Sequence, residues 1–292
     1  MSTIEIKGLF KAYGKTIALR DVSATMAHGK VTGLLGRNGA GKTTLLNIIT
    51  NHIFADYGEV WIDGQPAQEN DQAQAKIFYM TEKTLYPKDM RMGEVFCITQ
   101  MFYPTFNMDY AQTLAEQFQL EMKKKVGGLS TGYLTILKLI LALASNAETL
   151  IFDEPVLGLD ANHREMVYKE ILSQYKEGER TMIISTHLID EVARLLEEVI
   201  ILHEGKILIS QPVEALQQRA FTVSGEQAEV DSFVTGKNVV RVESLGRYKT
   251  ATLFQECSEK DLETAARLGL ELSAARLQDI FISLTHDAER RG

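Results

Sequence analysis

A glycine-rich segment between two apolar runs carries the clearest chemical signal in the sequence. Residues 36–44 read GRNGAGKTT and fit the pattern G-x-x-x-x-G-K-[ST] of a phosphate-binding loop. Glycines let such a loop curl with its backbone N–H groups inward, which makes an anion cradle at the start of a helix. The candidate binding residues are Gly36, Asn38, Gly39, Ala40, Gly41, Lys42, Thr43 and Thr44. The segment therefore predicts a site for the phosphates of a nucleotide.

Two side chains of this segment suit the phosphates and their metal ion. Lys42 can reach the β- and γ-phosphates, and the hydroxyl of Thr43 can hold Mg²⁺. An apolar run at 30–35 predicts a strand before the loop, and residues 44–49 predict a helix after it. A glycine-rich turn that matches by chance is the alternative, and this strand–loop–helix context disfavours it.

A second chemical signal is a pair of acids at the end of an apolar strand. Residues 149–153 read TLIFD, a run typical of a strand buried on both faces of a parallel sheet, and Glu154 follows. We expect Asp153 to bind Mg²⁺, directly or through water, and Glu154 to polarise the attacking water as a general base. The alternative is that the two acids are simply solvated at a strand end. Their position downstream of a phosphate loop disfavours it.

Composition narrows the class of protein. The chain has 292 residues, 45% of them hydrophobic and 24% charged, which is ordinary for a globular protein of one large and one smaller domain. A net charge of −8 argues against a nucleic-acid binder. Cys97 and Cys257 offer no zinc or disulfide framework and suit a reducing compartment. No run approaches the ~20 apolar residues of a membrane span, and no signal peptide is visible. We therefore expect a cytosolic chain.

The elements that must position these residues follow from periodicity and turn signals. The N-terminal strands are expected at residues 3–9, 16–25 and 58–64. Residues 83–147 predict mostly helix. A βαβ unit should run from the strand at 149–153 through a helix at 161–175 to a strand at 181–185.

The pattern changes near Pro212. Beyond residue 220 the expected order is β-α-β-β-α-β followed by a helix from Leu277, which suggests a small ferredoxin-like α+β module. We therefore divide the chain into a domain at 1–215, with a helical subdomain at 83–147, and an accessory module at 220–292. This module could support dimerisation or regulation.

A third motif, upstream of the acidic strand, indicates a specific protein family. Residues 129–133 read LSTGY and lie upstream of the acidic strand. With this motif order, residues 3–215 resemble the nucleotide-binding subunit of an ATP-binding-cassette (ABC) transporter, whose signature is L-S-G-G-Q. Ser130 and Gly132 match that signature, although L-S-T-G alone would usually be a plain helix cap. The resemblance implies an α/β P-loop NTPase core with an antiparallel β subdomain and a helical subdomain.

The resemblance also implies roles for further residues. Ser130 and Gly132 would donate to the γ-phosphate bound to a partner subunit. Tyr13 would stack on adenine, although a lone Tyr is more often a core residue. Asp160 would contact the partner subunit. His187 would donate to the γ-phosphate and hold Glu154 in place, although a lone strand-end His is normally structural.

Two departures from the family pattern stand out. Glu82 occupies the position where the family usually has a Gln that ligates Mg²⁺. We hypothesise that Glu82 keeps the metal role and makes the site more dependent on Mg²⁺. Thr131 and Tyr133 replace Gly and Gln of the signature. Because Thr131 is β-branched, we expect an ordinary backbone there, a working site and altered dimer affinity.

The function implied is an ATPase subunit with ATP and Mg²⁺ as cofactors. Two such subunits, identical or different, would sandwich ATP in a head-to-tail dimer on the inner face of the membrane. They would drive an integral-membrane permease on a separate chain, in a manner typical of bacterial exporters of drugs, antimicrobial peptides or toxin peptides. In the family, a groove beside the Met- and aromatic-rich residues 85–106 receives a short helix of the permease.

Two other classes remain as alternatives. One is a soluble ABC ATPase of translation or DNA repair, but such proteins usually carry two cassettes or a long coiled coil. The other is a degenerate subunit that binds ATP without hydrolysing it. The non-hydrolysing alternative is disfavoured because the sequence retains the residues expected for hydrolysis, which are Lys42, Asp153, Glu154 and His187. We expect no nucleic-acid partner.

Overall fold

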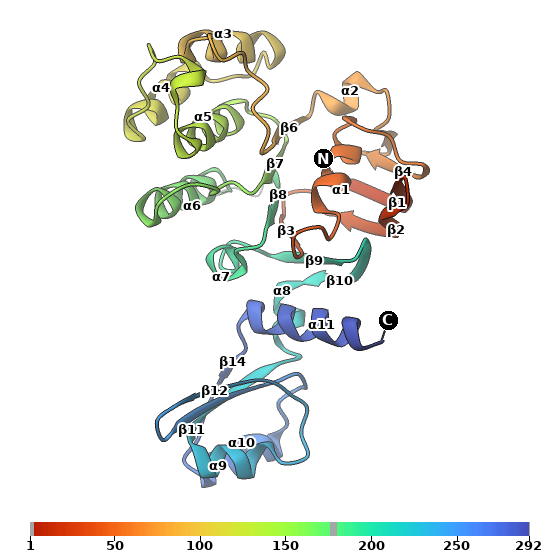
Figure 1. Ribbon diagram of the computed structural model, residues 1–292, viewed down its shortest axis with the longest axis vertical. Coiled ribbons are helices and arrows are strands. Elements are labelled where there is room, and N and C mark those ends of the chain that lie inside the picture. The colour runs from red at the N-terminus through yellow and green to blue at the C-terminus, as the bar shows by residue number, and fades with distance from the viewer. Residues whose placement is uncertain (1–2, 176–179, 292) are drawn as a thin grey trace. The chain divides into compact units, whose positions relative to one another are not determined.

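The computed structural model describes residues 3–175 and 180–291 and divides the chain into two compact units (Figure 1). The first unit comprises Met1–His187 and Leu202–Ile207, and the second comprises Leu188–Ile201 and Leu208–Gly292. The domain boundaries drawn from the sequence, 1–215 and 220–292, stay predictions.

An antiparallel sheet opens the first unit. Its strands are β1 (Ile4–Tyr13), β2 (Thr16–Met26), β4 (Tyr57–Ile62) and β5 (Gln65–Pro66), in the order β2-β1-β4-β5. A Cβ at Gly58, where φ is +87°, would lie 2.4 Å from the carbonyl oxygen of Gly8, so only glycine permits this close strand approach. The strands expected from the sequence are present, and β1 extends further than predicted.

A parallel sheet forms the centre of the first unit. Its neighbouring strands β3 (Val31–Leu35), β8 (Thr181–Thr186), β7 (Thr149–Asp153) and β6 (Ile77–Met80) follow one another in this order. Every residue of β3, β7 and β8 is buried, which explains their continuous apolar sequences. Ser185 pairs in register with Leu34 on one side and Asp153 on the other. The carboxyl ends of these strands therefore meet at one edge, where α/β folds bind ligands.

Helices flank this sheet and build a separate helical cluster. The helices α1 (Lys42–Ile49), α2 (Asp71–Gln74) and α6 (Ala161–Tyr175) connect the strands. The cluster consists of α3 (Met92–Phe102), α4 (Met108–Gln117), the 3-10 turn Val126–Gly128 and α5 (Thr131–Ala144) (Figure 1). Phe96 and Phe106 pack edge to face in its core, and α5 is almost wholly buried after Leu134. The predicted helical character of residues 83–147 is confirmed.

Two strands were missed by the sequence reading. They are β9 (Glu198–His203) and β10 (Lys206–Pro212), joined by a turn at Glu204 and Gly205, both with positive φ. The short helices α7 (Ile189–Val192) and α8 (Val213–Gln217) belong to the second unit.

The rest of the second unit is an α+β module. Its elements are β11 (Phe221–Glu226), α9 (Gln227–Val234), β12 (Val239–Leu245), β13 (Tyr248–Leu253), α10 (Glu259–Arg267), β14 (Glu271–Ala274) and α11 (Leu277–Arg291). The antiparallel strands have the order β12-β13-β11-β14. One sheet face packs on the helices through a core that includes Phe221, Val223, Phe233, Leu253 and Leu270. The predicted element order is present, whereas the ferredoxin-like assignment stays a prediction.

Candidate nucleotide site

The glycines of residues 36–44 are required by backbone geometry. Gly39 and Gly41 have φ of +82° and +108°, in the region that favours glycine. A Cβ on Gly41 would lie 2.6 Å from the carbonyl oxygen of Ala18, and one on Gly36 would lie 2.6 Å from that of Leu202. The loop therefore packs closely against its neighbours and ends at the N-terminus of α1, and a helix N-terminus favours an anion.

Lys42 lies across the loop that precedes it. Its Nζ donates to the carbonyl oxygen of Gly36 at 2.7 Å. Burial lowers the pKa of Lys42, and the nearby carboxylates of Glu154, Asp153 and Glu82 oppose that shift. A partly desolvated ammonium in this position gains most from an anionic ligand, because fewer waters compete for its N–H groups.

Asp153 accepts hydrogen bonds from hydroxyls on three different elements. Thr43 Oγ1 donates to Asp153 Oδ2 at 3.0 Å, Ser185 Oγ donates to Oδ1 at 2.8 Å, and the Tyr79 hydroxyl donates to Oδ2 at 3.3 Å. Burial and the charge of Asp153 raise the pKa of Tyr79, so this phenol stays a donor. The carboxylate is thus held rigidly at the sheet edge beside α1.

The oxygens of Thr43 and Asp153 fit a magnesium ion. Mg²⁺ binds oxygens octahedrally at about 2.0–2.1 Å, which puts adjacent ligands about 2.9 Å apart. The 3.0 Å between Thr43 Oγ1 and Asp153 Oδ2 matches that spacing. Glu82 lines the same pocket and is exposed, and Lys138 Nζ on α5 donates to its backbone oxygen at 2.5 Å.

Glu154 has an unusual backbone and two side-chain partners. Its φ is +51°, a conformation that costs a non-glycine residue about 1–3 kcal/mol. Its N–H donates to the Ser185 carbonyl at 2.8 Å. Its carboxylate accepts from Thr186 Oγ1 at 3.1 Å and lies 2.9 Å from His187 Nδ1. Because an ionised carboxylate only accepts, Nδ1 carries the proton in this contact.

A pocket of about 440 Å³ joins the phosphate loop to these acids. Its lining includes Tyr13, the segment 37–44, Glu82, Asp153 and Glu154. Tyr13 is 51% exposed, and Lys11 Nζ lies 5.6 Å from its ring centroid. The structure therefore brings together an exposed aromatic ring, an anion cradle and the two acids, as expected for a nucleotide.

The signature residues do not line this pocket in the part of the chain that the structure describes. Ser130 is exposed and caps α5 by accepting from the Tyr133 N–H at 3.3 Å. A Cβ on Gly132 would lie 2.8 Å from the carbonyl oxygen of Gly158, so this glycine permits the two loops to touch. Thr131 begins α5 with a negative φ, which confirms the expected ordinary backbone.

Asp160 has a local structural partner. Its Oδ1 accepts from the His163 backbone N–H at 2.9 Å, and its Oδ2 lies 2.9 Å from His163 Nδ1. These bonds cap the start of α6, and the backbone bond is the main reason that the pKa of Asp160 is lowered. The side chain is also exposed, so contact with a partner subunit stays a prediction.

Sequence reasoning missed the hydroxyls of Tyr79, Ser185 and Thr186, which hold the two acids. Each lies at or near the carboxyl end of a strand beside β7. Strand-end position in a parallel sheet is the signal that could have found them.

Known proteins match both the sequence and the fold. A family model described as "ABC transporter" matches residues 19–157. The ABC transporter ATP-binding protein YtrB of Bacillus subtilis is 27% identical, covering 96% of this chain and 97% of that protein. The ABC transporter ATP-binding protein NatA of the same organism is 30% identical, covering 69% and 84%. The Nod factor export ATP-binding protein I of Rhizobium johnstonii is 29% identical, covering 97% and 94%.

The fold agrees with these relatives. A solved ATP-binding subunit of an ABC transporter superposes with a TM-score of 0.67 at 23% identity, covering 73% of this chain and 91% of that one. The fold and the pocket define a P-loop ATPase. The chain belongs to the ABC transporter family, as an ATP-binding, ATP-hydrolysing subunit. The predicted transporter ATPase is confirmed, and the non-transport alternative is not favoured.

Across residues 3–175 and 180–291, none of the helices has both the length and the apolar character needed to span a membrane.

Proposed function

We propose that this subunit powers an exporter and hydrolyses Mg²⁺-ATP between two cassettes. One observation carries the proposal: Thr43, Asp153 and Glu154 meet at one pocket, whereas Ser130 and Gly132 at the start of α5 do not line it, and Ser130 is exposed. The chain thus presents one nearly complete nucleotide site and an anion-binding helix end that a second subunit can use.

Thr43 and Asp153 would hold Mg²⁺, and Glu82 would join them from the pocket wall. The ion would neutralise charge on the phosphates during transfer. Lys42 leaves its bond to the Gly36 carbonyl and donates to phosphate oxygens. Tyr13 supplies an exposed face for adenine.

Glu154 is the proposed general base. Its two oxygens accept from Thr186 and His187 and keep lone pairs for a water molecule. The carboxylate orients that water and takes its proton. His187, bonded through Nδ1, keeps Nε2 for the γ-phosphate when the ring is protonated. Its bond to Glu154 would couple the general base to the presence of that phosphate.

The partner subunit would supply Ser130 and Gly132 to the other phosphate face. Ser130 opens a helix of 14 residues, whose free N–H groups and dipole favour an anion. The signature contacts the loop at Gly158, and Asp160 follows two residues later, which supports its use on the same surface of the chain. A head-to-tail dimer, homomeric or heteromeric, uses both surfaces at once.

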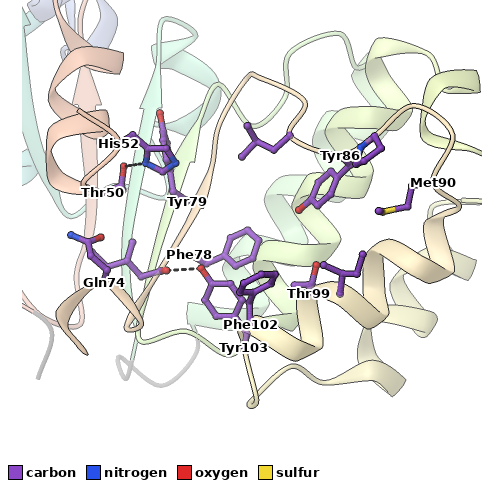
Figure 2. A pocket seen from close by; sticks show the side chains of 14 residues that line it. Thr50, His52, Gln74, Phe78, Tyr79, Tyr86, Met90, Thr99, Phe102 and Tyr103 are labelled. Carbon is purple, nitrogen blue, oxygen red and sulfur yellow. Dashed lines mark hydrogen bonds between the residues drawn. The ribbon is translucent and has the colours of Figure 1, made fainter. Parts of the chain in front are cut away.

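A second pocket, of about 440 Å³, suits the permease helix. Figure 2 shows the rings of Phe78, Phe102 and Tyr103 close together, with Tyr79 of β6 on one side and Tyr86 and Met90 on the other. Its lining is mainly aromatic and apolar, and a soft apolar groove favours an amphipathic helix. Phe102 in this lining and Met101 next to it in sequence are 77% and 81% exposed, which is costly unless a partner covers them.

The rest of the Met- and aromatic-rich segment has a different role. Met92, Phe96 and Phe106 are buried in the helical cluster. The segment is therefore partly core and partly groove.

The name of one relative supports the direction of transport, and the location is part of our proposal. The word "export" in the name of the Rhizobium relative supports an exporter, and the drug or peptide cargo remains our proposal. We infer that the subunit lies at the cytoplasmic face of the membrane, held there by the permease.

The experiment that tests this function is Glu154→Gln in the full chain. We expect the variant to form an ATP-dependent dimer, measured by light scattering, and to lose at least about 100-fold in hydrolysis rate, the contribution of a general base. Glu165→Gln, an exposed carboxylate paired with Lys169 on α6, is the matched control and should behave as wild type. A Glu154→Gln chain that stays monomeric in ATP and turns over normally would overturn the proposal.

A further inference from the structure

The second unit carries two polar rows across the sheet face opposite its apolar core. Thr222 pairs in register with Thr252 and Ser273, and Thr252 pairs with Arg241. The next row is Glu243, Thr250, Ser224 and Glu271. Side chains two residues apart on a strand share a face, so both rows face away from the apolar core.

A polar outer face is ordinary for an antiparallel sheet, but this one is hollowed. A pocket of about 250 Å³ is lined by Thr222, Ser224, Arg241, Glu243, Thr250, Thr252, Ser273, Ala274, Arg276 and Asp279. Nearly all of these side chains are polar. The residues come from all four strands and from the start of α11, which is the arrangement of a built cavity.

A buried carboxylate fixes two arginines at this pocket. Asp279 is 3% exposed and accepts from Arg241 Nη1. It also accepts from Arg276 Nε at 3.0 Å and from Arg276 Nη2 at 3.4 Å. These bonds raise the pKa of Arg276 and hold both guanidinium groups in fixed directions.

The two guanidinium groups share the carboxylate of Glu243, and Arg276 Nη1 also lies 3.9 Å from Asp190 Oδ2. Arg241 Nη2 donates to Glu243 Oε1 at 2.5 Å, and Arg276 Nη2 lies 3.8 Å from the same atom. The Glu243 side chain is 52% exposed, so it can rotate into solvent when another anion binds between the arginines. The position of Glu243 Oε1 is therefore an oxyanion position between two preorganised donors.

The floor of the pocket suits hydroxyl groups. Thr222 and Thr252 hydroxyls lie 3.3 Å apart, and those of Ser224 and Thr250 lie 3.1 Å apart. A hydroxyl has one donor and two acceptor sites, so each pair keeps capacity for another partner. The volume corresponds to about eight waters at about 30 Å³ each, which suits a small metabolite.

We propose that this pocket binds a small hydroxylated oxyanion. Its carboxylate or phosphate lies between Arg241 and Arg276 and displaces Glu243, and its hydroxyls bond the Ser and Thr rows. All the residues lie in the second unit, so the proposal stands apart from the ATPase site. The accessory module thereby gains a ligand-sensing surface.

Isothermal titration calorimetry of the full chain tests this with three probes on one carbon skeleton: glycerate, glycerol 3-phosphate and glycerol. We expect saturable binding of at least one anion and none of glycerol. The tighter anion identifies a carboxylate or a phosphate head group.

Three variants make the test specific. Arg276→Gln should weaken anion binding at least tenfold. Glu243→Gln should tighten it severalfold, because the internal competitor loses its charge, and a purely structural face would not respond in this way. Lys249→Gln, which removes a cation paired with Asp231 outside the pocket lining, should leave binding unchanged.

Several results would overturn the proposal. The first is that neither wild type nor Glu243→Gln binds either anion saturably. The second is that glycerol binds as tightly as the anions. The third is that Arg276→Gln binds the anions with unchanged affinity. Thermal melting checks that each variant is folded, and Glu243→Gln keeps the test decisive if Arg276→Gln unfolds.

Discussion

The hydroxyl of Thr43 donates to the carboxylate of Asp153 at 3.0 Å, across 110 residues of sequence. This bond joins the first turn of α1 to the end of β7 and sets two oxygens at the spacing of adjacent magnesium ligands. The two oxygens that we propose as magnesium ligands are thus positioned by the fold itself.

Thr43→Ala should weaken Mg²⁺-dependent ATP binding about tenfold, because one of the two oxygens that we propose as magnesium ligands is lost. Titration of a fluorescent ATP analogue at several Mg²⁺ concentrations measures this. Thr113→Ala removes an exposed hydroxyl that bonds the Asp109 carbonyl within α4 and should change nothing. Equal Mg²⁺ dependence in Thr43→Ala and wild type would contradict the assignment.

Glu82→Gln should lower the dependence of ATPase rate on Mg²⁺. The exposed Glu82 carboxylate shares the pocket with Asp153 and Glu154, so its charge favours the cation and disfavours free phosphate. The rate measured against Mg²⁺ concentration gives the apparent metal affinity. If Glu82→Gln changed neither the apparent Mg²⁺ affinity nor the ATPase rate, the hypothesis that Glu82 binds the metal would be wrong.

His187→Ala should reduce the hydrolysis rate about 10²- to 10³-fold and leave ATP affinity within about threefold. The imidazole lies 2.9 Å from the Glu154 carboxylate, so its loss frees the proposed base without touching the phosphate loop. Single-turnover hydrolysis and equilibrium nucleotide binding separate the two effects. A variant that loses affinity but keeps its maximal rate would assign His187 to binding instead.

Gly132→Ala should reduce ATPase activity at least about tenfold. The new Cβ would lie 2.8 Å from the Gly158 carbonyl oxygen, so the start of α5 or that loop must move. Gly128→Ala is the matched control, because a Cβ there meets nothing within 4 Å. The steady-state ATPase rates of the two variants are compared. Equal rates would contradict the steric argument.

Asp261→Asn should destabilise the second unit by about 1–2 kcal/mol near neutral pH. Burial acts to raise the pKa of Asp261, but hydrogen bonds from Lys237 and Ser258 outweigh it and lower the pKa to about 2. A depressed folded-state pKa contributes stability above the unfolded value of about 3.9, and that stability is lost as pH falls toward 2.

Urea unfolding of wild type and Asp261→Asn between pH 3 and 7 measures this contribution. The difference should be largest at pH 5–7 and shrink below pH 4. Glu263→Gln, an exposed neighbour on α10, serves as the control. A difference that does not change with pH would show that the charge of Asp261 is not the cause.

Much of the fold could be predicted because its signals are local. The phosphate loop needs glycine at fixed positions, and a continuous apolar run such as 149–153 has few alternatives to a buried strand. The strands at 198–212 were missed. Although residues 198–203 are nearly all buried, exposed and half-buried residues dominate Lys206–Pro212, so no simple alternation marks the pair.

The sequence by itself determined that this protein has a phosphate loop, an acidic strand end and a signature segment in the order of an ABC ATPase. Only the tertiary structure decided which hydroxyls hold Asp153, because Tyr79 and Ser185 reach it from neighbouring strands. It also separated the core Phe96 from the groove residue Phe102, which share one helix and one residue type. Local patterns record backbone preference and burial, whereas contacts between distant segments depend on strand order and register, which no local pattern specifies.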